Sequence, residues 1–146
     1  MTVTVTEEMQ TIILKKAEDT ESFAENFAKN IAAPSIIFLE GELGAGKTTF
    51  TKGFLRGLGY TKTVKSPTFT LVETYDINER TILHADLYRI KDPCELEAMG
   101  FRDYFNEKNI ILIEWASRAR SWLPKPTVQC TLVIPENGVG RVLQVI

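Results

Sequence analysis

Residues 41–48 read Gly-Glu-Leu-Gly-Ala-Gly-Lys-Thr and match the pattern G-x-x-x-x-G-K-[ST] at every fixed position. The apolar run Ile36–Leu39 comes directly before this segment and indicates a short buried strand. Residues 48–58 predict a helix that Gly59 closes. The segment therefore joins the end of a buried strand to the start of a helix, and this arrangement favours an α/β fold.

A loop of this kind can curl around phosphate groups. Glycines let its backbone N–H groups turn toward phosphate oxygens, and the following helix adds the positive end of its dipole. Lys47 then supplies a cation for the β- and γ-phosphates, Thr48 a hydroxyl for Mg²⁺, and Thr49 a further phosphate contact. An ordinary glycine-rich turn is the alternative. The predicted phosphate-binding residues are Gly41, Glu42, Leu43, Gly44, Ala45, Gly46, Lys47, Thr48 and Thr49.

Two acidic residues compete for the second Mg²⁺ contact that such a loop needs. Glu114 ends the apolar run Ile110–Ile113, and Asp86 ends the less apolar run Ile82–Ala85. Ligands of open α/β sheets bind at the carboxyl ends of strands, where both acids are expected. We predict Glu114 as the metal ligand and Asp86 as a residue that orients the attacking water or holds a metal-bound water. For each acid the alternative is a salt bridge or a loop cap. The GTPase signature N-K-x-D does not occur, and no D-x-x-G follows the loop at a suitable position. The absence of these signatures is the only reason to favour ATP over GTP.

The rest of the chain reads as alternating short strands and helices. Phe23, Phe27 and Ile31 recur at helical spacing, with Ser22 and Glu25 as a predicted capping box. The other expected elements are a strand over 10–15, an antiparallel hairpin of 68–75 and 81–85, a helical stretch over 94–105 interrupted at Gly100, and a terminal hairpin of 127–134 and 141–146.

Composition narrows the class of protein further. The chain has 146 residues and a net charge of -2, so no basic excess advertises DNA or other direct nucleic-acid binding. No apolar run approaches the roughly 20 residues of a membrane helix, and the first eight residues lack the regions of a secretory signal. Cys94 and Cys130 form no CxxC pair. We expect one domain over residues 1–146, in the cytoplasm, with both cysteines as thiols.

Four segments together resemble the TsaE (YjeE) family, the ATPases of bacterial tRNA threonylcarbamoyladenosine biosynthesis. They are GELGAGKTT at 41–49, SPTFTLVETY at 66–75, HADLYR at 84–89 and IEW at 113–115. The first segment is shared by many families, but the four in this order are specific. The resemblance extends from about residue 20 to residue 115.

The resemblance implies a single P-loop domain with a mixed parallel and antiparallel sheet flanked by helices. It implies slow ATP hydrolysis with Mg²⁺ held by Thr48 and Glu114, nucleotide contacts from Thr20 and Trp115, and an acid tied to hydrolysis at Asp86. Residues 66–68 take the place of a switch loop. The implied partner is the TsaD–TsaB pair, which transfers threonylcarbamoyl to the adenosine next to the anticodon of tRNAs reading ANN codons, so that tRNA is met indirectly.

Other functions stay open on the residues alone. A small-molecule kinase would share the loop, although only Arg118 and Arg120 imitate the basic lid that it needs. A binding module that uses ATP only to set its conformation is a third possibility. His84 is either a structural histidine or a neighbour of the γ-phosphate, and Arg89 either a packing residue or an arginine finger. Lys47 and Asp86 are the predicted catalytic residues.

Overall fold

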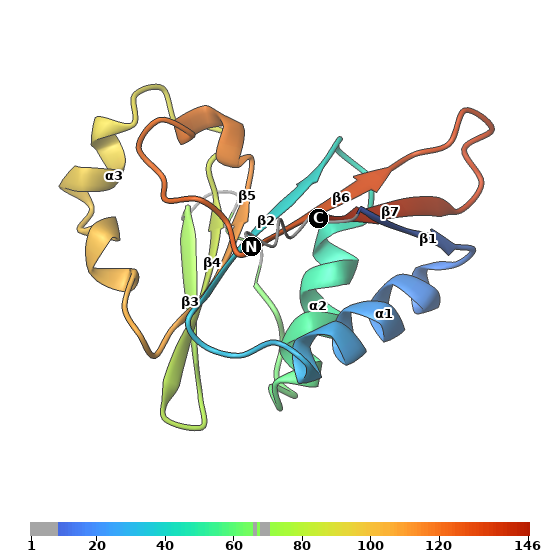
Figure 1. Ribbon diagram of the computed structural model, residues 1–146, viewed down its shortest axis with the longest axis horizontal. Helices are drawn as coiled ribbons and strands as arrows, with labels where there is room; N and C mark the ends of the chain where they lie inside the picture. Colours follow the sequence, from blue (N-terminus) through green and yellow to red (C-terminus); the bar gives the residue numbers. More distant parts are fainter. Residues whose placement is uncertain (1–8, 66, 68–70) are drawn as a thin grey trace, which may run out of the picture.

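Seven strands of the described residues form one mixed sheet (Figure 1). The computed structural model describes residues 9–65, 67 and 71–146. Across the sheet the strands are β1 (Gln10–Leu14), β7 (Arg141–Val145), β6 (Val128–Val133), β2 (Ser35–Gly41), β5 (Ile110–Glu114), β4 (Arg80–Asp86) and β3 (Val72–Ile77). The four strands β6, β2, β5 and β4 are parallel, whereas β1, β7 and β3 join through antiparallel pairs. The expected α/β fold with a mixed sheet is confirmed.

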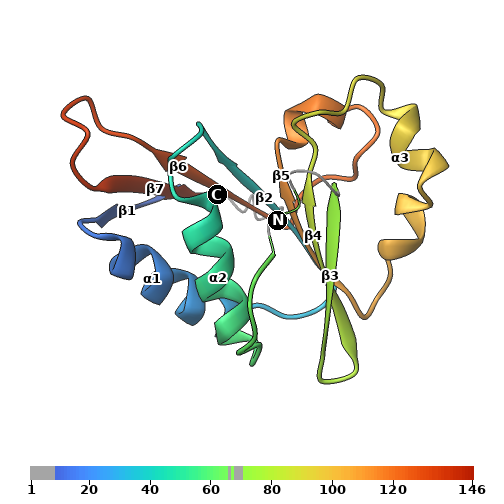
Figure 2. The same ribbon diagram turned by 180° about the vertical axis from the view of Figure 1, so that it is seen from behind.

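The helices divide between the two faces of the sheet (Figure 1, Figure 2). Helices α1 (Ala17–Lys29) and α2 (Lys47–Gly57) cover one face, and α3 (Cys94–Ala98) with the 3₁₀ helices η1 (Phe101–Tyr104) and η2 (Ala116–Ala119) covers the other. Alternation along β5 sends Ile110 and Leu112 toward α1 and α2, and Ile111 and Ile113 toward the opposite core. Glu114, two residues after Leu112, therefore lies on the face of α2.

Two glycines let α1 and α2 approach closely. A Cβ atom built on Gly53 would lie 2.2 Å from the carbonyl oxygen of Glu21, and one on Gly57 would lie 2.3 Å from that of Glu25. Phe50 and Phe54 of α2, both fully buried, pack against Phe27 of α1 at ring-centroid distances of 6.1 Å. This packing fixes α2, and with it the loop that precedes the helix.

Helix α1 begins earlier than the sequence predicted. Its first residue is Ala17, and the backbone N–H of Lys16 donates to Oδ2 of Asp19 at 3.0 Å. The predicted cap at Ser22 is therefore wrong, since Ser22 lies inside the helix. Asp19 stands three residues after Lys16 and satisfies an N–H at the helix entry, so the cap forms at Lys16 instead of Ser22. The helix ends at Lys29, before Pro34 as expected.

The remaining elements follow the predictions with somewhat different limits; β4, for example, covers Arg80–Asp86 instead of 81–85. The β3–β4 turn contains only Asn78 and Glu79, both with positive φ, instead of the five residues expected. Residues 68–70 of the predicted strand lie outside the described residues. Gly100, with φ of +74°, interrupts the helical stretch as predicted.

The terminal hairpin of β6 and β7 is confirmed, and β7 also pairs with β1. The β1–β7 pair joins the two ends of the chain within the sheet, and Leu14 stands opposite Arg141. No helix among residues 9–65, 67 and 71–146 is long and apolar enough to cross a membrane. The single domain over residues 1–146 stays a prediction.

Candidate functional site

The loop of residues 41–46 leaves the end of β2 and enters α2 at Lys47. Gly44 and Gly46 have φ of +82° and +105°, a region that L side chains rarely adopt. Position 41 requires glycine for a different reason: a Cβ atom there would lie 2.9 Å from the carbonyl oxygen of Leu132. The backbone conformation therefore requires glycine at these positions of the motif. The loop places the N-terminus of α2 at the carboxyl edge of the sheet.

Lys47 folds back over this loop. Its side chain is buried, and Nζ donates to the carbonyl oxygen of Gly41 at 2.5 Å. The same Nζ lies 3.9 Å from Oε1 of Glu114 and 4.5 Å from the centre of the Trp115 ring. The lysine charge is thus held between a carbonyl, a carboxylate and an aromatic face, in the place where the motif predicts a phosphate-binding cation.

The two predicted acids stand side by side. Asp86 ends β4 and Glu114 ends β5, and the two residues are direct partners in the parallel register. Glu114 is 6% exposed, whereas Asp86 is half-buried. The expectation that both acids meet at the carboxyl edge of the sheet is confirmed by this placement.

A histidine holds the buried acid. Nε2 of His84 lies 2.6 Å from Oε2 of Glu114, and both side chains are almost fully buried. Nδ1 of His84 is buried and has no hydrogen-bond partner among the described residues. His84 therefore belongs to the site through Glu114, which makes it more than the isolated structural histidine that the sequence left possible.

Asp86 has a fixed orientation and a perturbed pKa. Its Oδ1 accepts a hydrogen bond from the backbone N–H of Tyr88 at 3.0 Å. Burial raises the pKa of Asp86 above its ordinary value, and the neighbouring Glu114 carboxylate adds to the rise. The Tyr88 N–H and the positive charge of Lys47 oppose it. The net direction favours the protonated acid more than for an exposed aspartate.

An aromatic pair borders the acids. The rings of Tyr88 and Trp115 lie 4.9 Å apart, and the guanidinium of Arg118 lies 5.3 Å from the centre of the Tyr88 ring. Trp115 has a φ of +56°, which brings its ring over Lys47 directly after β5 ends. Arg89 is exposed and is not among the described residues that line the hollows described next.

Two hollows flank the loop. One, of about 330 Å³, brings together most of the predicted residues: Leu43, Gly44, Gly46, Lys47, Thr48, Thr49, Asp86, Glu114 and Trp115. We call it the acidic hollow. Gly41, Glu42 and Ala45 do not line it. Among the described residues, no three His, Cys, Asp or Glu side chains gather as a complete metal site.

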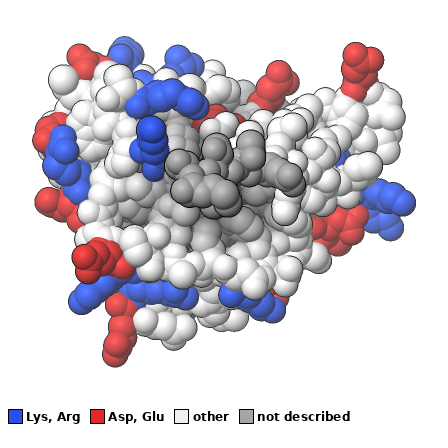
Figure 3. All heavy atoms as spheres, in the orientation of Figure 1, with Lys and Arg blue, Asp and Glu red and all other residues white. Residues whose placement is uncertain are grey.

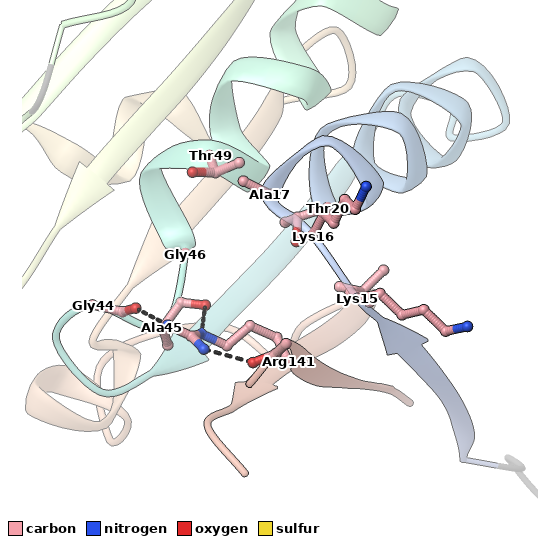
Figure 4. A pocket seen from close by; sticks show the side chains of 11 residues that line it. Lys15, Lys16, Ala17, Thr20, Gly44, Ala45, Gly46, Thr49 and Arg141 are labelled. Atoms are coloured by element: carbon pink, nitrogen blue, oxygen red, sulfur yellow. Dashed lines mark hydrogen bonds between the residues drawn. The ribbon is translucent and has the colours of Figure 1, made fainter. Parts of the chain in front are cut away.

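The second hollow, of about 240 Å³, also borders the loop and lies beside α1 (Figure 4). We call it the α1 hollow. Thr20, which is buried, reaches it from the first turn of α1. The structure therefore places Thr20 and Trp115 in different hollows beside the loop. The lining residues are Leu14, Lys15, Lys16, Ala17, Thr20, Gly44, Ala45, Gly46, Thr49, Gly140 and Arg141.

Sequence reasoning missed Lys15, Lys16, Gly140 and Arg141 as residues beside the loop. No motif marks them, and they come from the two ends of the chain, which meet only because β1 pairs with β7. Ser66 and Thr68 of the predicted switch loop lie outside the described residues.

The chain matches one family model over residues 14–141, that of the threonylcarbamoyl adenosine biosynthesis protein TsaE. The tRNA threonylcarbamoyladenosine biosynthesis protein TsaE of Haemophilus influenzae is 50% identical over 109 residues, which cover 74% of this chain and 69% of that protein. The protein of the same name from Bacillus subtilis is 41% identical over 121 residues, which cover 83% of this chain and 74% of that protein.

A solved structure agrees with these relatives. The crystal structure of YdiB from Bacillus subtilis superimposes with a TM-score of 0.80 at 30% sequence identity, and the match covers 97% of this chain and 87% of that one. The family match contains the loop, both acids and the residues of the α1 hollow. The chain therefore belongs to the TsaE family and, with it, to the biosynthesis of threonylcarbamoyladenosine in tRNA.

Proposed function

We propose that this protein binds and hydrolyses ATP on the loop of residues 41–48 and so supports the TsaD–TsaB pair in forming threonylcarbamoyladenosine. The observation that carries the proposal is the acidic hollow, where Lys47, Thr48, Asp86 and Glu114 converge beside the N-terminus of α2. A cation, a hydroxyl and two carboxylates around a glycine loop suit phosphoryl chemistry, in which positioning and charge stabilisation do most of the work.

The loop and Lys47 would hold the phosphates. Backbone N–H groups at the start of α2 supply donors, and the helix dipole adds partial positive charge. Nζ of Lys47 already lies at the loop, 2.5 Å from the carbonyl oxygen of Gly41. From there the ammonium can stabilise negative charge that develops on the β- and γ-phosphates.

The donors present fit Mg²⁺. Oxygen ligands suit this ion, which usually keeps waters and takes one or two protein ligands beside phosphate oxygens. Glu114 offers a buried carboxylate and Thr48 an exposed hydroxyl that line the same hollow. Bound there, Mg²⁺ would neutralise charge on the phosphates. His84 would keep the Glu114 carboxylate in one orientation through its 2.6 Å contact.

Asp86 would place the attacking water. The N–H of Tyr88 fixes the carboxylate, and the register keeps it next to Glu114. Its raised pKa makes the ionised form a better proton acceptor than an exposed aspartate would be.

The α1 hollow would take the adenosine part of the nucleotide. It adjoins the acidic hollow and shares Gly44, Gly46 and Thr49 with it. Thr20 lines it as the predicted nucleotide contact. A nucleotide that lies across the loop would place its phosphates and its base on the two sides.

This protein would act on tRNA indirectly, through the TsaD–TsaB pair. On the face that Figure 3 shows, lysines and arginines are interspersed with acidic side chains over the described residues. The net charge of -2 agrees with this view. Direct RNA binding usually needs a basic stripe, so this distribution supports an indirect role.

The test is ATP hydrolysis with Mg²⁺, measured alone and with the purified TsaD–TsaB pair and tRNA. We expect slow turnover alone, faster turnover with the pair, and collapse of both in Asp86→Ala. Asp76→Ala is the matched control, because Asp76 is an exposed aspartate of the β3–β4 hairpin whose carboxylate accepts a hydrogen bond from the Thr81 hydroxyl. Stimulation by a small metabolite, with no effect of the pair, would replace this proposal with the kinase alternative.

A further inference from the structure

Arg141, near the C-terminal end of the chain, donates hydrogen bonds to the loop of residues 41–48 (Figure 4). Its Nη2 donates to the carbonyl oxygen of Gly44 at 3.0 Å, and its Nε donates to that of Ala45 at 3.2 Å. Nη1 donates to the carbonyl oxygen of its neighbour Gly140 at 2.5 Å. One guanidinium therefore fixes two successive peptide groups of a loop that lies 96–97 residues away in sequence.

The direction of these bonds matters for the loop amides. In a trans peptide the C=O and N–H groups lie in one plane and point in opposite directions. Since the Ala45 carbonyl points at Arg141, the N–H of Gly46 points away from Arg141. The Gly44 carbonyl is held likewise, and the N–H on its peptide, that of Ala45, donates to Glu42 at 3.0 Å. Arg141 thus sets the orientation of a loop amide at the entrance to α2.

The loop needs such an anchor because of its own glycines. Gly44 and Gly46 have positive φ, and glycine can leave that conformation easily. Arg141 itself is well supported. It opens β7 opposite Leu14, and the turn before it approaches β1 so closely that a Cβ atom on Gly140 would lie 2.8 Å from the Leu14 carbonyl oxygen.

The other cations of the α1 hollow do not share this role. In Figure 4 the side chains of Lys15 and Lys16 extend away from the loop, whereas the Arg141 guanidinium points at Gly44 and Ala45. A planar guanidinium can hold two carbonyls at once, which a lysine ammonium on a flexible stem does poorly.

We propose that Arg141 is a positioning residue, which holds the peptide groups of residues 44–46 in the orientation that binds the nucleotide's phosphates. The proposal rests on the proposed function, because it assumes that the loop binds ATP. In this role Arg141 acts through the loop and not by contact with the base or ribose. The C-terminal hairpin, which carries Arg141, thereby contributes to phosphate binding.

The test compares ATP with inorganic tripolyphosphate, which carries the phosphates without base or ribose. Both are titrated with Mg²⁺ into the wild type, Arg141→Ala, Arg141→Lys and the control Lys29→Ala, an exposed residue at the end of α1. Arg141→Ala should weaken both ligands by the same factor, about ten- to a hundredfold for lost charged hydrogen bonds. Arg141→Lys should recover less than half of that loss on a logarithmic scale, although it keeps the charge.

Three results would overturn the inference. They are unchanged binding of both ligands in Arg141→Ala, a loss confined to ATP, which would make Arg141 an adenosine contact, and full recovery in Arg141→Lys, which would make it a simple charge. If Arg141→Ala does not fold, Arg141→Lys alone tests the proposal, which requires this variant to bind tripolyphosphate more weakly than the wild type does. A wild type that binds neither ligand would instead refute the proposed function.

Discussion

Nε2 of His84 lies 2.6 Å from Oε2 of Glu114, across the two neighbouring strands β4 and β5. The other carboxylate oxygen, Oε1, lies 3.9 Å from Nζ of Lys47. One buried acid is thus held from two sides, by a histidine and by the lysine of the loop. Under the proposed function this arrangement matters, because a carboxylate fixed at both oxygens has little freedom to turn away from a bound Mg²⁺.

Replacing His84 should therefore raise the Mg²⁺ requirement. Removal of a residue that orients a metal ligand commonly costs about 10–100-fold in metal affinity. We expect His84→Ala to need about tenfold more Mg²⁺ than the wild type for half-maximal hydrolysis. Its affinity for ATP without Mg²⁺ should stay close to that of the wild type.

His84→Gln is the matched control for this experiment, because the glutamine amide nitrogen can take the place of Nε2. It should recover most of the Mg²⁺ affinity. Equal Mg²⁺ requirements in the wild type and His84→Ala would show that the contact with Glu114 has no bearing on metal binding.

Asp86→Asn should separate activity from stability. We expect hydrolysis to fall by about 10²–10⁴-fold, since the amide cannot accept the proton of a water. Burial raises the pKa of Asp86 above its ordinary value of 3.8, so the folded state binds this proton more tightly than the unfolded chain. The ionised acid therefore destabilises the fold at pH 7, and the loss develops as pH rises from 3.8 through the raised pKa.

Thermal melting of Asp86→Asn checks this sign. The variant should melt at a higher temperature than the wild type at pH 7, and the difference should shrink as pH falls through that window. A lower melting temperature of the variant at pH 7 would contradict the direction of the pKa shift.

Gly53→Ala should destabilise the protein. The added Cβ atom would lie 2.2 Å from the carbonyl oxygen of Glu21, so α1 and α2 must separate. Overpacking of this kind costs about 1–3 kcal/mol, measured as the free energy of unfolding in urea. Lys52→Ala, at the exposed neighbouring position of α2, serves as the control and should change this free energy little. Equal stability of both variants would mean that the helices are not in close contact.

The two cysteines should differ in reactivity. Burial raises the pKa of the Cys130 thiol to about 12, whereas Cys94 is exposed. Since the thiolate is the reactive form, a disulfide reagent should modify one thiol per folded chain, and the second only after unfolding. Rapid reaction of two thiols in the folded protein would place Cys130 at the surface. Cys94→Ser identifies the reactive residue, because it should abolish the fast reaction.

The strand, loop and helix of residues 35–57 could be predicted because one motif requires this backbone geometry. Asp86 and Glu114 could be placed together for a related reason. Each follows an apolar run, and parallel strands end at one edge. Local pattern and tertiary placement agree at these positions.

Elsewhere the information lies in pairings that a linear pattern does not contain. Arg141 reaches the loop only because β7 pairs with β1, and no local signal marks it. The predicted start of α1 is wrong because Ser22 resembles a cap in sequence, whereas the contact of Asp19 with Lys16 satisfies the backbone earlier in the chain. His84 looked isolated in sequence, since its partner Glu114 lies 30 residues away.

The most direct test of the account is calorimetric titration of ATP with Mg²⁺ into the wild type and Lys47→Ala, with Lys52→Ala as a charge-matched control on the same helix. The account predicts that the wild type and Lys52→Ala bind ATP with the same affinity. Lys47→Ala should bind ATP roughly a hundredfold more weakly, because the phosphates of ATP lose a charged hydrogen bond from the lysine. Near-normal affinity in Lys47→Ala would contradict the assignment of the loop of residues 41–48 as the ATP site.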